Sequence, residues 1–297
     1  MQKLSQPYKE LDLSIIIVNF NSGQYLTRCL DFLKKNRPHC SFEIFVVDNG
    51  STDNSSEVVK NFYKDVKLIR NSSNFGFSYA NNQAIVRSKG RYILILNPDT
   101  IVTRGAIDAL VEFMDNTPDA GIAGAKMLNL DGSLQYSCRR FPTVLYVFFG
   151  RQSFLTKFLP YNKLSREYLM MDEDYSKNFE VDWVFGASML LRRKALEEVG
   201  IFDDDYFLFV EDTDLCFRMR EKGWKVYFVS QAVIFHHLGV TRNKFWQIAI
   251  LNHNIGMYKF FNKHYHLNPF LKGVFAFGLS LRLLFLGAIK TANNFFH

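Results

Sequence analysis

The chain has 297 residues, of which 48% are apolar and 22% charged, a composition that argues against a disordered or collagen-like protein. This length predicts one large domain or two smaller ones. The four cysteines form no CxxC pair, so neither a disulfide framework nor a zinc site is indicated, and a reducing, cytoplasmic setting is favoured. The 36 lysines and arginines exceed the 29 aspartates and glutamates, which gives a formal net charge of +7.

The positive charge is concentrated at the carboxyl end. No acidic residue follows Glu221, whereas nine of the 36 lysines and arginines do, so the first 221 residues carry 27 positive against 29 negative charges. Such a one-sided basic segment predicts an anionic partner: nucleic acid, anionic lipid or a phosphorylated substrate.

The apolar stretch at 274–289 favours the lipid among these partners. As a helix it would extend about 24 Å, which is short of the roughly 30 Å hydrocarbon core of a bilayer. We therefore expect an interfacial helix on a membrane, and the alternative is a helix packed on the body or on a second subunit. The amino end is polar and does not resemble a signal peptide.

The amino-terminal half alternates apolar runs of strand length with helical patterns. The predicted elements are strands at 14–20, 42–48, 66–70 and 92–96 and helices at 24–35, from 51–53 onward and at 78–88. This order predicts an α/β fold with a parallel sheet and right-handed crossovers. Ligands of such sheets bind beyond the carboxyl ends of the strands.

The second half is less regular. Residues 131–182 predict an irregular insertion, and order returns at 182–192. Helices are predicted at 194–199 and 211–222, and a pair of strands at 226–229 and 232–235 ends at His236 and His237.

Two carboxylates follow predicted strands. Asp48 can accept a hydrogen bond from a nucleobase or a ribose hydroxyl, although it can also simply cap the next helix. Asp99, in Asn97-Pro98-Asp99, can hold a divalent cation that bridges two phosphates. The alternative for Asn97-Pro98-Asp99 is an ordinary turn that starts a helix.

A third group of acids, Glu211-Asp212-Thr213-Asp214, begins a predicted helix. The helix dipole stabilises a carboxylate there, which suits a base that takes a proton from a hydroxyl. The alternative is that these acids only stabilise the start of the helix. His236 and His237 can ligate a metal, but neighbouring strand side chains face opposite ways, so both cannot serve one ion. The sequence contains no GxSxG elbow, Walker loop or GxGxxG fingerprint, which removes several enzyme classes.

Five motifs, in the same order, strongly resemble those of glycosyltransferase family 2. They are SIIIVNFN at 14–21, VVDNGSTD at 46–53, NFGF at 74–77, LNPD at 96–99 and FVEDTDLC at 209–216. The motifs RRFP at 139–142 and GASML at 186–190 are similar to the rhamnosyltransferase branch. The resemblance covers about residues 13–240.

This resemblance implies a GT-A fold, in which a Rossmann-like, mostly parallel sheet is flanked by helices. We expect a GT-A domain at 1–240, with its nucleotide-binding part at about 13–130 and its acceptor and catalytic part at about 131–240. A helical, basic and aromatic tail at 241–297 would follow and associate with a membrane surface.

The resemblance also implies a donor site at the strand ends. Its residues would be Val18 and Phe20 in the nucleoside pocket, Asp48 at the pyrimidine edge, Gly76 and Asn82 near the ribose and diphosphate, and Asn97 on the sugar nucleotide. Asp99 takes the second acidic position of the family's D-x-D motif, and Asn97 replaces the first acid. Asp99 would therefore be the motif's only ligand to Mg²⁺ or Mn²⁺.

The remaining implied roles concern the metal, the base and the acceptor. His236 would complete the metal site, with its neighbour His237 as the alternative. Asp212 aligns with the general base of an inverting transfer. The candidate acceptor contacts are Arg139, Arg140 and Glu211, although charged loop residues such as the two arginines are often simply solvated.

The leading hypothesis is a peripheral enzyme on the cytoplasmic face of the inner membrane. It would transfer L-rhamnose from dTDP-rhamnose to a hydroxyl of a lipid-linked or cell-surface glycan. The alternatives are a UDP-hexose or UDP-N-acetylhexosamine donor, or a sugar nucleotidyltransferase, whose cationic loop after the first strand is missing at 21–24. A nucleic-acid binder that uses the basic tail is the third hypothesis, and nucleic acid is not the expected partner.

Overall fold

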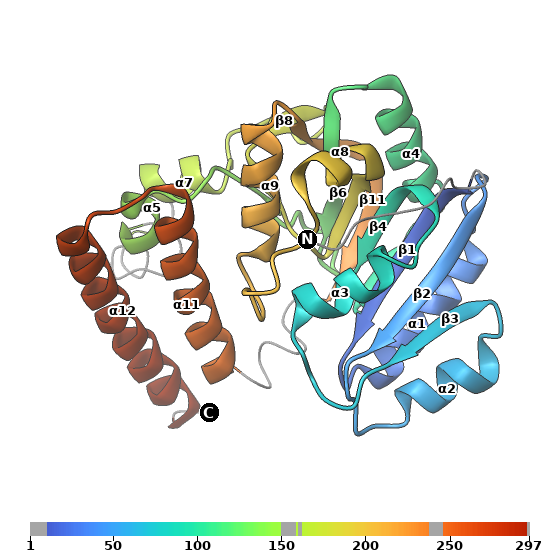
Figure 1. Ribbon diagram of the computed structural model, residues 1–297, viewed down its shortest axis with the longest axis horizontal. Coiled ribbons are helices and arrows are strands. Elements are labelled where there is room, and N and C mark those ends of the chain that lie inside the picture. The colour runs from blue at the N-terminus through green and yellow to red at the C-terminus, as the bar shows by residue number, and fades with distance from the viewer. Residues whose placement is uncertain (1–10, 150–158, 160–161, 238–245, 296–297) are drawn as a thin grey trace.

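A nine-stranded sheet forms the centre of the molecule, and the computed structural model describes residues 11–149, 159, 162–237 and 246–295 (Figure 1). The strands of this sheet are β1 (Leu11–Asn19), β2 (Phe42–Asp48), β3 (Val66–Arg70), β4 (Gly90–Leu96), β5 (Thr100–Val102), β6 (Ala120–Leu128), β8 (Phe179–Val181), β10 (Ser188–Arg192) and β11 (Lys225–His236). Their order is β3-β2-β1-β4-β10-β6-β11-β5, and β8 pairs with the first half of β11. A separate small sheet pairs β7 (Cys138–Arg139) with β9 (Trp183–Val184).

Six strands of the large sheet run in one direction. β3, β2, β1 and β4 are parallel neighbours, and β6 is parallel to β11. β10 is antiparallel to both β4 and β6, so it joins the two parallel groups in a common direction. β5 and β8 are antiparallel to β11. The predicted mostly parallel α/β sheet is therefore confirmed, and the antiparallel strand at its centre was not predicted.

Helices lie on both faces of the sheet. One layer contains α1 (Gly23–Lys35), α2 (Ser55–Phe62) and α4 (Ala106–Asn116), and the other contains α3 (Phe77–Ile85), α8 (Arg193–Val199) and α9 (Glu211–Glu221). Because successive strand side chains point to opposite faces, β1 serves both layers. Leu13, Ile15 and Ile17 pack in the first layer and Ile16 in the second, all fully buried.

In the amino-terminal half, the start of one helix was predicted wrongly and one strand was missed. The second helix begins at Ser55 rather than at 51–53. The polar side chains before it bind the β1–α1 loop instead, since Ser51 Oγ accepts from the N–H of Asn21 (2.9 Å) and Asp53 Oδ2 from that of Gly23 (3.0 Å). Strand β6 was missed, because its sequence AGIAGAKML is poor in the β-branched and aromatic residues that mark strands.

The second half is more ordered than predicted. The insertion at 131–182 contains α5 (Val144–Phe149) and α7 (Lys163–Tyr168) as well as short strands. The predicted strand pair after 225 is one continuous strand, β11, whose pairing with β6 shifts register between Val229 and Val233. A bulge of this kind lets one strand continue past an irregularity. All four cysteines are free, as expected.

Two antiparallel helices end the chain, α11 (Trp246–His264) and α12 (Pro269–Phe295), and α12 is longer than the predicted 274–289 (Figure 1). Within the described ranges, no helix combines the length and apolarity that a bilayer span requires. Aromatic residues join this pair to the body. The Phe217 ring on α9 lies 5.4 Å from the ring of Phe260 and 4.3 Å from that of His264, centroid to centroid, both on α11.

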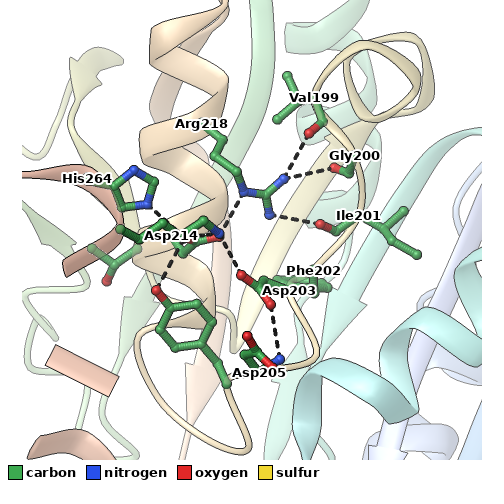
Figure 2. A network of polar contacts seen from close by, with 12 residues as sticks. Val199, Gly200, Ile201, Phe202, Asp203, Asp205, Asp214, Arg218 and His264 are labelled. Carbon is green, nitrogen blue, oxygen red and sulfur yellow. Dashed lines mark hydrogen bonds and ion pairs between the residues drawn. The ribbon is translucent and has the colours of Figure 1, made fainter. Parts of the chain in front are cut away.

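A buried carboxylate fastens α11 to α9 (Figure 2). Asp214, with no exposed surface, lies 2.8 Å from each of Arg218 Nε, Lys263 Nζ and His264 Nε2, and accepts a hydrogen bond from the Tyr206 hydroxyl at 3.3 Å. Burial alone would raise the pKa of Asp214, but the hydrogen bond from His264 and the charges of Arg218 and Lys263 outweigh it and hold this pKa well below its usual range.

The Asp214→Asn variant is expected to lower the free energy of unfolding by about 3 kcal/mol at neutral pH, because Arg218 and Lys263 lose their buried counter-charge. A depressed carboxylate pKa stabilises the fold above the unfolded value of about 3.9 and stops doing so as the pH falls through the folded value. The difference between wild type and variant should therefore shrink below about pH 4. Urea denaturation at several pH values measures it.

The matched control for this experiment is Asp172→Asn, which removes an exposed ion pair with Arg166. An exposed pair contributes at most about 1 kcal/mol. Equal losses in the two variants would contradict the assigned role of Asp214.

Candidate functional site

Four parallel strands bring polar residues to one edge of the sheet. Asn19 and Asp48 are the last residues of β1 and β2, Asn97 directly follows β4, and His236 ends β11. The carboxyl ends of parallel strands meet at the same edge, where ligands of such sheets bind. Nearly all of these side chains were predicted from their place after apolar runs; Asn19 was not.

Asn19 anchors Asp48. The side-chain amide nitrogen of Asn19 lies 2.8 Å from Asp48 Oδ1 and 2.8 Å from Ser55 Oγ. Both Asn19 and Asp48 are buried, so these contacts supply the partners that buried polar groups require. A buried asparagine within an otherwise apolar strand was the available signal for Asn19. Val18 and Phe20, on either side of it, are half-buried, and their contact with a nucleoside stays a prediction.

Gly76 lies where two loops meet. Its φ is +93°, and a Cβ there would come within 2.6 Å of the carbonyl oxygen of Phe207, so only glycine fits. The next N–H, that of Phe77, donates to the same carbonyl at 2.7 Å. Asn49, which was not predicted, joins this turn to β2 because its amide donates to the carbonyl of Gly76 at 3.1 Å.

Asn82 holds the loop that precedes α9. Its side-chain nitrogen donates to the carbonyl of Phe202 (2.8 Å) and to Asp204 Oδ1 (2.7 Å), and its Oδ1 accepts from the N–H of Phe202 (3.2 Å). The predicted contact with the ribose or diphosphate stays untested. The structure adds that Asn82 positions a loop on the way to Asp212.

Asp99 and His236 form the candidate metal site. Asp99 Oδ1 lies 3.4 Å from His236 Nε2, and both side chains are largely buried. The pairing of β5 with β11 sets Thr100 opposite His236 and so brings the two residues together. Asp99 Oδ1 is buried and has no hydrogen-bond partner. A carboxylate oxygen and an imidazole nitrogen are suitable ligands for Mn²⁺ or Mg²⁺, so the residues fit the cation.

The described residues contain no cluster of three or more metal-ligating side chains. Water and a donor diphosphate would therefore complete the coordination shell. His237 has a different environment from His236: its N–H donates to the carbonyl oxygen of Asp99 (2.9 Å), and its ring makes an edge contact with Tyr25 at 5.2 Å between centroids. The geometry favours His236 over His237 as the ligand.

Asp212 lies at the start of α9. Its Oδ2 accepts from the N–H of Gly186 (3.0 Å), and its Oδ1 accepts from the N–H of Thr213 (2.8 Å). Burial raises the pKa of Asp212, and these two N–H donors limit the rise. Asp212 is therefore more basic than an exposed aspartate.

Glu211 is nearly fully buried, and its Oε2 has no hydrogen-bond partner. Burial and the nearby charge of Asp212 raise the pKa of Glu211 well above its usual value. As the pH falls, Glu211 is therefore expected to take up a proton before Asp212 does. Its predicted contact with an acceptor stays a prediction.

Residues 186–187 lie between Asn97 and Asp212 and are hydrogen-bonded to both. The carbonyl of Ala187 accepts from the N–H of Asn97 (3.0 Å), while the preceding N–H, that of Gly186, donates to Asp212. This short segment ends at β10, the antiparallel strand next to β4. Asn97 and Asp212 are thus hydrogen-bonded to the same short segment, and Asp99 follows Asn97 by two residues.

The turn before Asp212 is strained. Phe209 and Val210 have φ values of +68° and +72°, in the left-handed region that β-branched residues such as valine rarely adopt. Gly256 of α11 packs against this turn, and a Cβ at Gly256 would lie 2.9 Å from Val210 Cγ2. Strain of this kind persists only where neighbouring structure holds it.

The two arginines predicted for the acceptor have different environments. Arg139 is buried, donates to the carbonyl of Cys138 (2.8 Å) and lies over the Phe185 ring. Arg140 lies on a hollow of about 610 Å³ that also includes Asp182 and Arg220. Because Arg220 is eight residues after Asp212 on α9, this hollow lies about 12 Å along the helix from the base. Acceptor binding by either arginine stays a prediction.

Solved structures share this architecture. The mannosyltransferase PcManGT from Pyrobaculum calidifontis, in complex with GDP-Man and Mn²⁺, has a TM-score of 0.60 at 17% identity and covers 97% of this chain and 79% of its own. GalNAc-T7 with UDP, GalNAc and Mn²⁺ has a TM-score of 0.57 at 18% identity over 76% of this chain and 44% of its own. The fold is thus the GT-A fold of glycosyltransferases.

Sequence relatives define the family. Residues 14–200 match Glycosyl transferase family 2, and the chain belongs to that family. An N-acetylglucosaminyl-diphospho-decaprenol L-rhamnosyltransferase of Mycobacterium tuberculosis is 31% identical over 76% of this chain and 76% of its own length. The rhamnosyltransferase WbbL of Escherichia coli is 27% identical over 80% of this chain and 88% of its own. The chain is therefore a glycosyltransferase, as the motifs predicted.

The two histidines are separated by a metal titration. His236→Ala should weaken Mn²⁺ binding in the presence of dTDP by at least about tenfold, because it removes a proposed ligand. His237→Ala, the matched control, keeps its backbone bond to Asp99 and should bind Mn²⁺ within about twofold of wild type. The loss of the free Mn²⁺ signal in electron paramagnetic resonance measures binding, and the reverse order of effects would assign the site to His237.

Proposed function

We propose that this protein is a metal-dependent, inverting rhamnosyltransferase. It transfers L-rhamnose from dTDP-rhamnose to a hydroxyl of a lipid-linked or cell-surface glycan. The observation that carries the proposal is the linkage of Asn97, two residues before Asp99 of the Asp99–His236 pair, to Asp212 through Gly186 and Ala187. A diphosphate site and a base on one rigid unit are what a single in-line displacement needs.

The proposed reaction has one base. Asp212 takes the proton of the acceptor hydroxyl, whose oxygen bonds to the anomeric carbon as the bond to the diphosphate breaks on the opposite face of the sugar. The configuration at that carbon is therefore inverted. The N–H groups of Gly186 and Thr213 fix the orientation of the carboxylate, and each of its oxygens keeps a lone pair for the acceptor.

Asp99 and His236 would hold Mg²⁺ or Mn²⁺. A bound cation supplies neutralisation of the charge that develops on the leaving diphosphate. Asn97, beside them, donates and accepts hydrogen bonds to the sugar nucleotide in this proposal, and Asp48 contacts the base from its anchored position next to Asn19.

The choice of rhamnose rests on the two rhamnosyltransferases reported above, of which the mycobacterial enzyme acts on a decaprenol-linked N-acetylglucosamine. By analogy we propose a lipid-linked acceptor. A UDP-hexose or UDP-N-acetylhexosamine donor is the alternative within the same family. The neighbours solved with Mn²⁺ support a divalent cation in either case.

Asp212→Asn should abolish transfer from dTDP-rhamnose, with a loss of at least about 10²-fold because proton removal fails, while dTDP binding stays near normal. The wild-type rate should fall on acidification, and from a higher pH than an ordinary aspartate would give, since the pKa of Asp212 is raised and its protonated form is no base. Initial rates between pH 5 and 9 measure both effects.

Asp172→Asn is the control for this assay and should retain full activity. Near-normal turnover of Asp212→Asn would contradict the general-base assignment. Turnover of the wild type with UDP-sugars but not with dTDP-rhamnose would contradict the donor and leave the base intact.

We further propose that α11 and α12 associate with the cytoplasmic face of the inner membrane. On α12, five exposed apolar residues repeat at intervals of four and three and so form one face: Phe270, Val274, Phe277, Leu281 and Leu284. The lysines and arginines of these helices contribute less to membrane association than the net charge suggested. Lys263 pairs with Asp203 and Asp214, and Arg282, which is half-buried, donates to Asn254 Oδ1 at 2.9 Å.

Phe277→Ser and Leu284→Ser should each weaken binding to phosphatidylcholine–phosphatidylglycerol vesicles by roughly 10- to 100-fold, because each removes about 1.5–3 kcal/mol of apolar burial. The control is Phe62→Ser, which changes a residue that is 75% exposed on α2, outside this face. Co-sedimentation with vesicles measures binding. Equal sedimentation of all variants would contradict the membrane face, and dimerisation lost in the α12 variants would assign it to a second subunit.

A further inference from the structure

Gln135 is a buried residue of the irregular segment after β6, and no motif indicated a role for it. It lies between the ends of β6 and β11. Its N–H donates to the carbonyl of Met127 on β6 (2.9 Å), and its side-chain nitrogen donates to the carbonyl of His236 on β11 (2.7 Å) and to Asn129 Oδ1 (2.8 Å). The other end of the amide, Oε1, lies 3.0 Å from His236 Nδ1.

The orientation of this amide follows from its neighbours. The carbonyl of His236 can only accept a hydrogen bond, so the Gln135 atom that faces it must be the NH₂ group. The reversed amide would set its oxygen against that carbonyl and leave two acceptors in contact inside a buried site. Gln135 Oε1 therefore faces the imidazole, where it can only accept.

The orientation of the amide in turn fixes the tautomer of His236. Since Gln135 Oε1 accepts, Nδ1 of the neutral imidazole carries the hydrogen, and Nε2 keeps its lone pair. That lone pair faces Asp99 Oδ1 at 3.4 Å, and this oxygen has no hydrogen-bond partner. Two electron-rich atoms that face each other in a buried site are stabilised by a cation between them.

We propose that Gln135 is a positioning residue of the metal site. It holds His236 as the Nδ1–H tautomer with its ring fixed, so that Nε2 and Asp99 Oδ1 present lone pairs to one divalent cation. A purely structural role explains less, because β6 and β11 already pair along their length without this side chain. The inference rests on the proposed metal dependence, and its first test needs neither metal nor activity.

The first measurement is the tautomer of His236 in metal-free wild type, read from the imidazole ¹⁵N shifts in long-range ¹H–¹⁵N spectra and assigned with His236→Ala. The expected result is a protonated Nδ1 and an unprotonated Nε2. A proton on Nε2 overturns the proposal.

The second measurement is Mn²⁺ affinity in the presence of dTDP. Gln135→Met keeps the length of the side chain but can neither orient nor accept from Nδ1–H, and should weaken Mn²⁺ binding by about 10- to 100-fold, the usual range for a residue that orients a metal ligand. Gln135→Glu keeps an acceptor for Nδ1–H, and in its protonated form its second oxygen can donate to the carbonyl of His236, so this variant should restore part of the affinity. The matched control is Gln83→Met on α3, which removes the amide pair between Gln83 and Asn71.

The outcomes are distinct. Weak Mn²⁺ binding and mixed tautomers in Gln135→Met, with rescue in Gln135→Glu and normal binding in Gln83→Met, support the proposal. Wild-type affinity in Gln135→Met overturns it, as does a wild type that binds no Mn²⁺. If Gln135→Met fails to fold, the wild-type tautomer and the glutamate variant still decide. Activity in Asp212→Asn bears only on the transfer mechanism.

Discussion

At one edge of the sheet, strands that are apolar along their length end in polar residues that are still buried. These groups need partners, as do the polar residues of the nearby helices α3 and α9, and the partners come from segments far away in the sequence: Asn19 for Asp48, Phe202 for Asn82, Gly186 for Asp212. The loops of the site are therefore fixed relative to one another before any ligand arrives. Asp99 Oδ1, Glu211 Oε2 and Asn19 Oδ1 are among the buried atoms without a hydrogen-bond partner, and we expect the substrate and its cation beside the first two.

Much of the first half of the fold could be predicted because its strands and helices have clear local sequence patterns. Runs such as YILIL and FEIFVVD mark strands, and the polar residue after each run marks the edge. β6 could not be recognised in the same way, since its alanines and glycines are chosen by close packing: a Cβ at Gly124 would meet Val184 at 2.7 Å. Such a requirement comes from a distant segment and leaves no periodic pattern.

In the site, too, some residues could be predicted from local patterns and others depend on distant segments. The sequence offered two adjacent histidines, and strand geometry said only that one of them must face away. The choice between them depends on which residue pairs with Thr100 across β5 and β11, a long-range register. Gln135 belongs to the same class, because its role exists only once β6 and β11 lie side by side. The excess positive charge was a coarser signal, since part of it serves to bind acids such as Asp203 and Asp214.

Gly256 connects the position of α9 to α11, a helix beyond the residues that match the family. The family match stops at residue 200, yet α11 presses on Val210 through a contact that only a residue without a side chain permits. A shortened protein without α11 would let the backbone at Val210 relax, and because α9 starts at the next residue, the whole helix would turn about that point. The aspartate that we propose as the general base thus depends on a helix that lies beyond the residues matched by the family, so exchanging carboxyl-terminal segments between relatives would change its position.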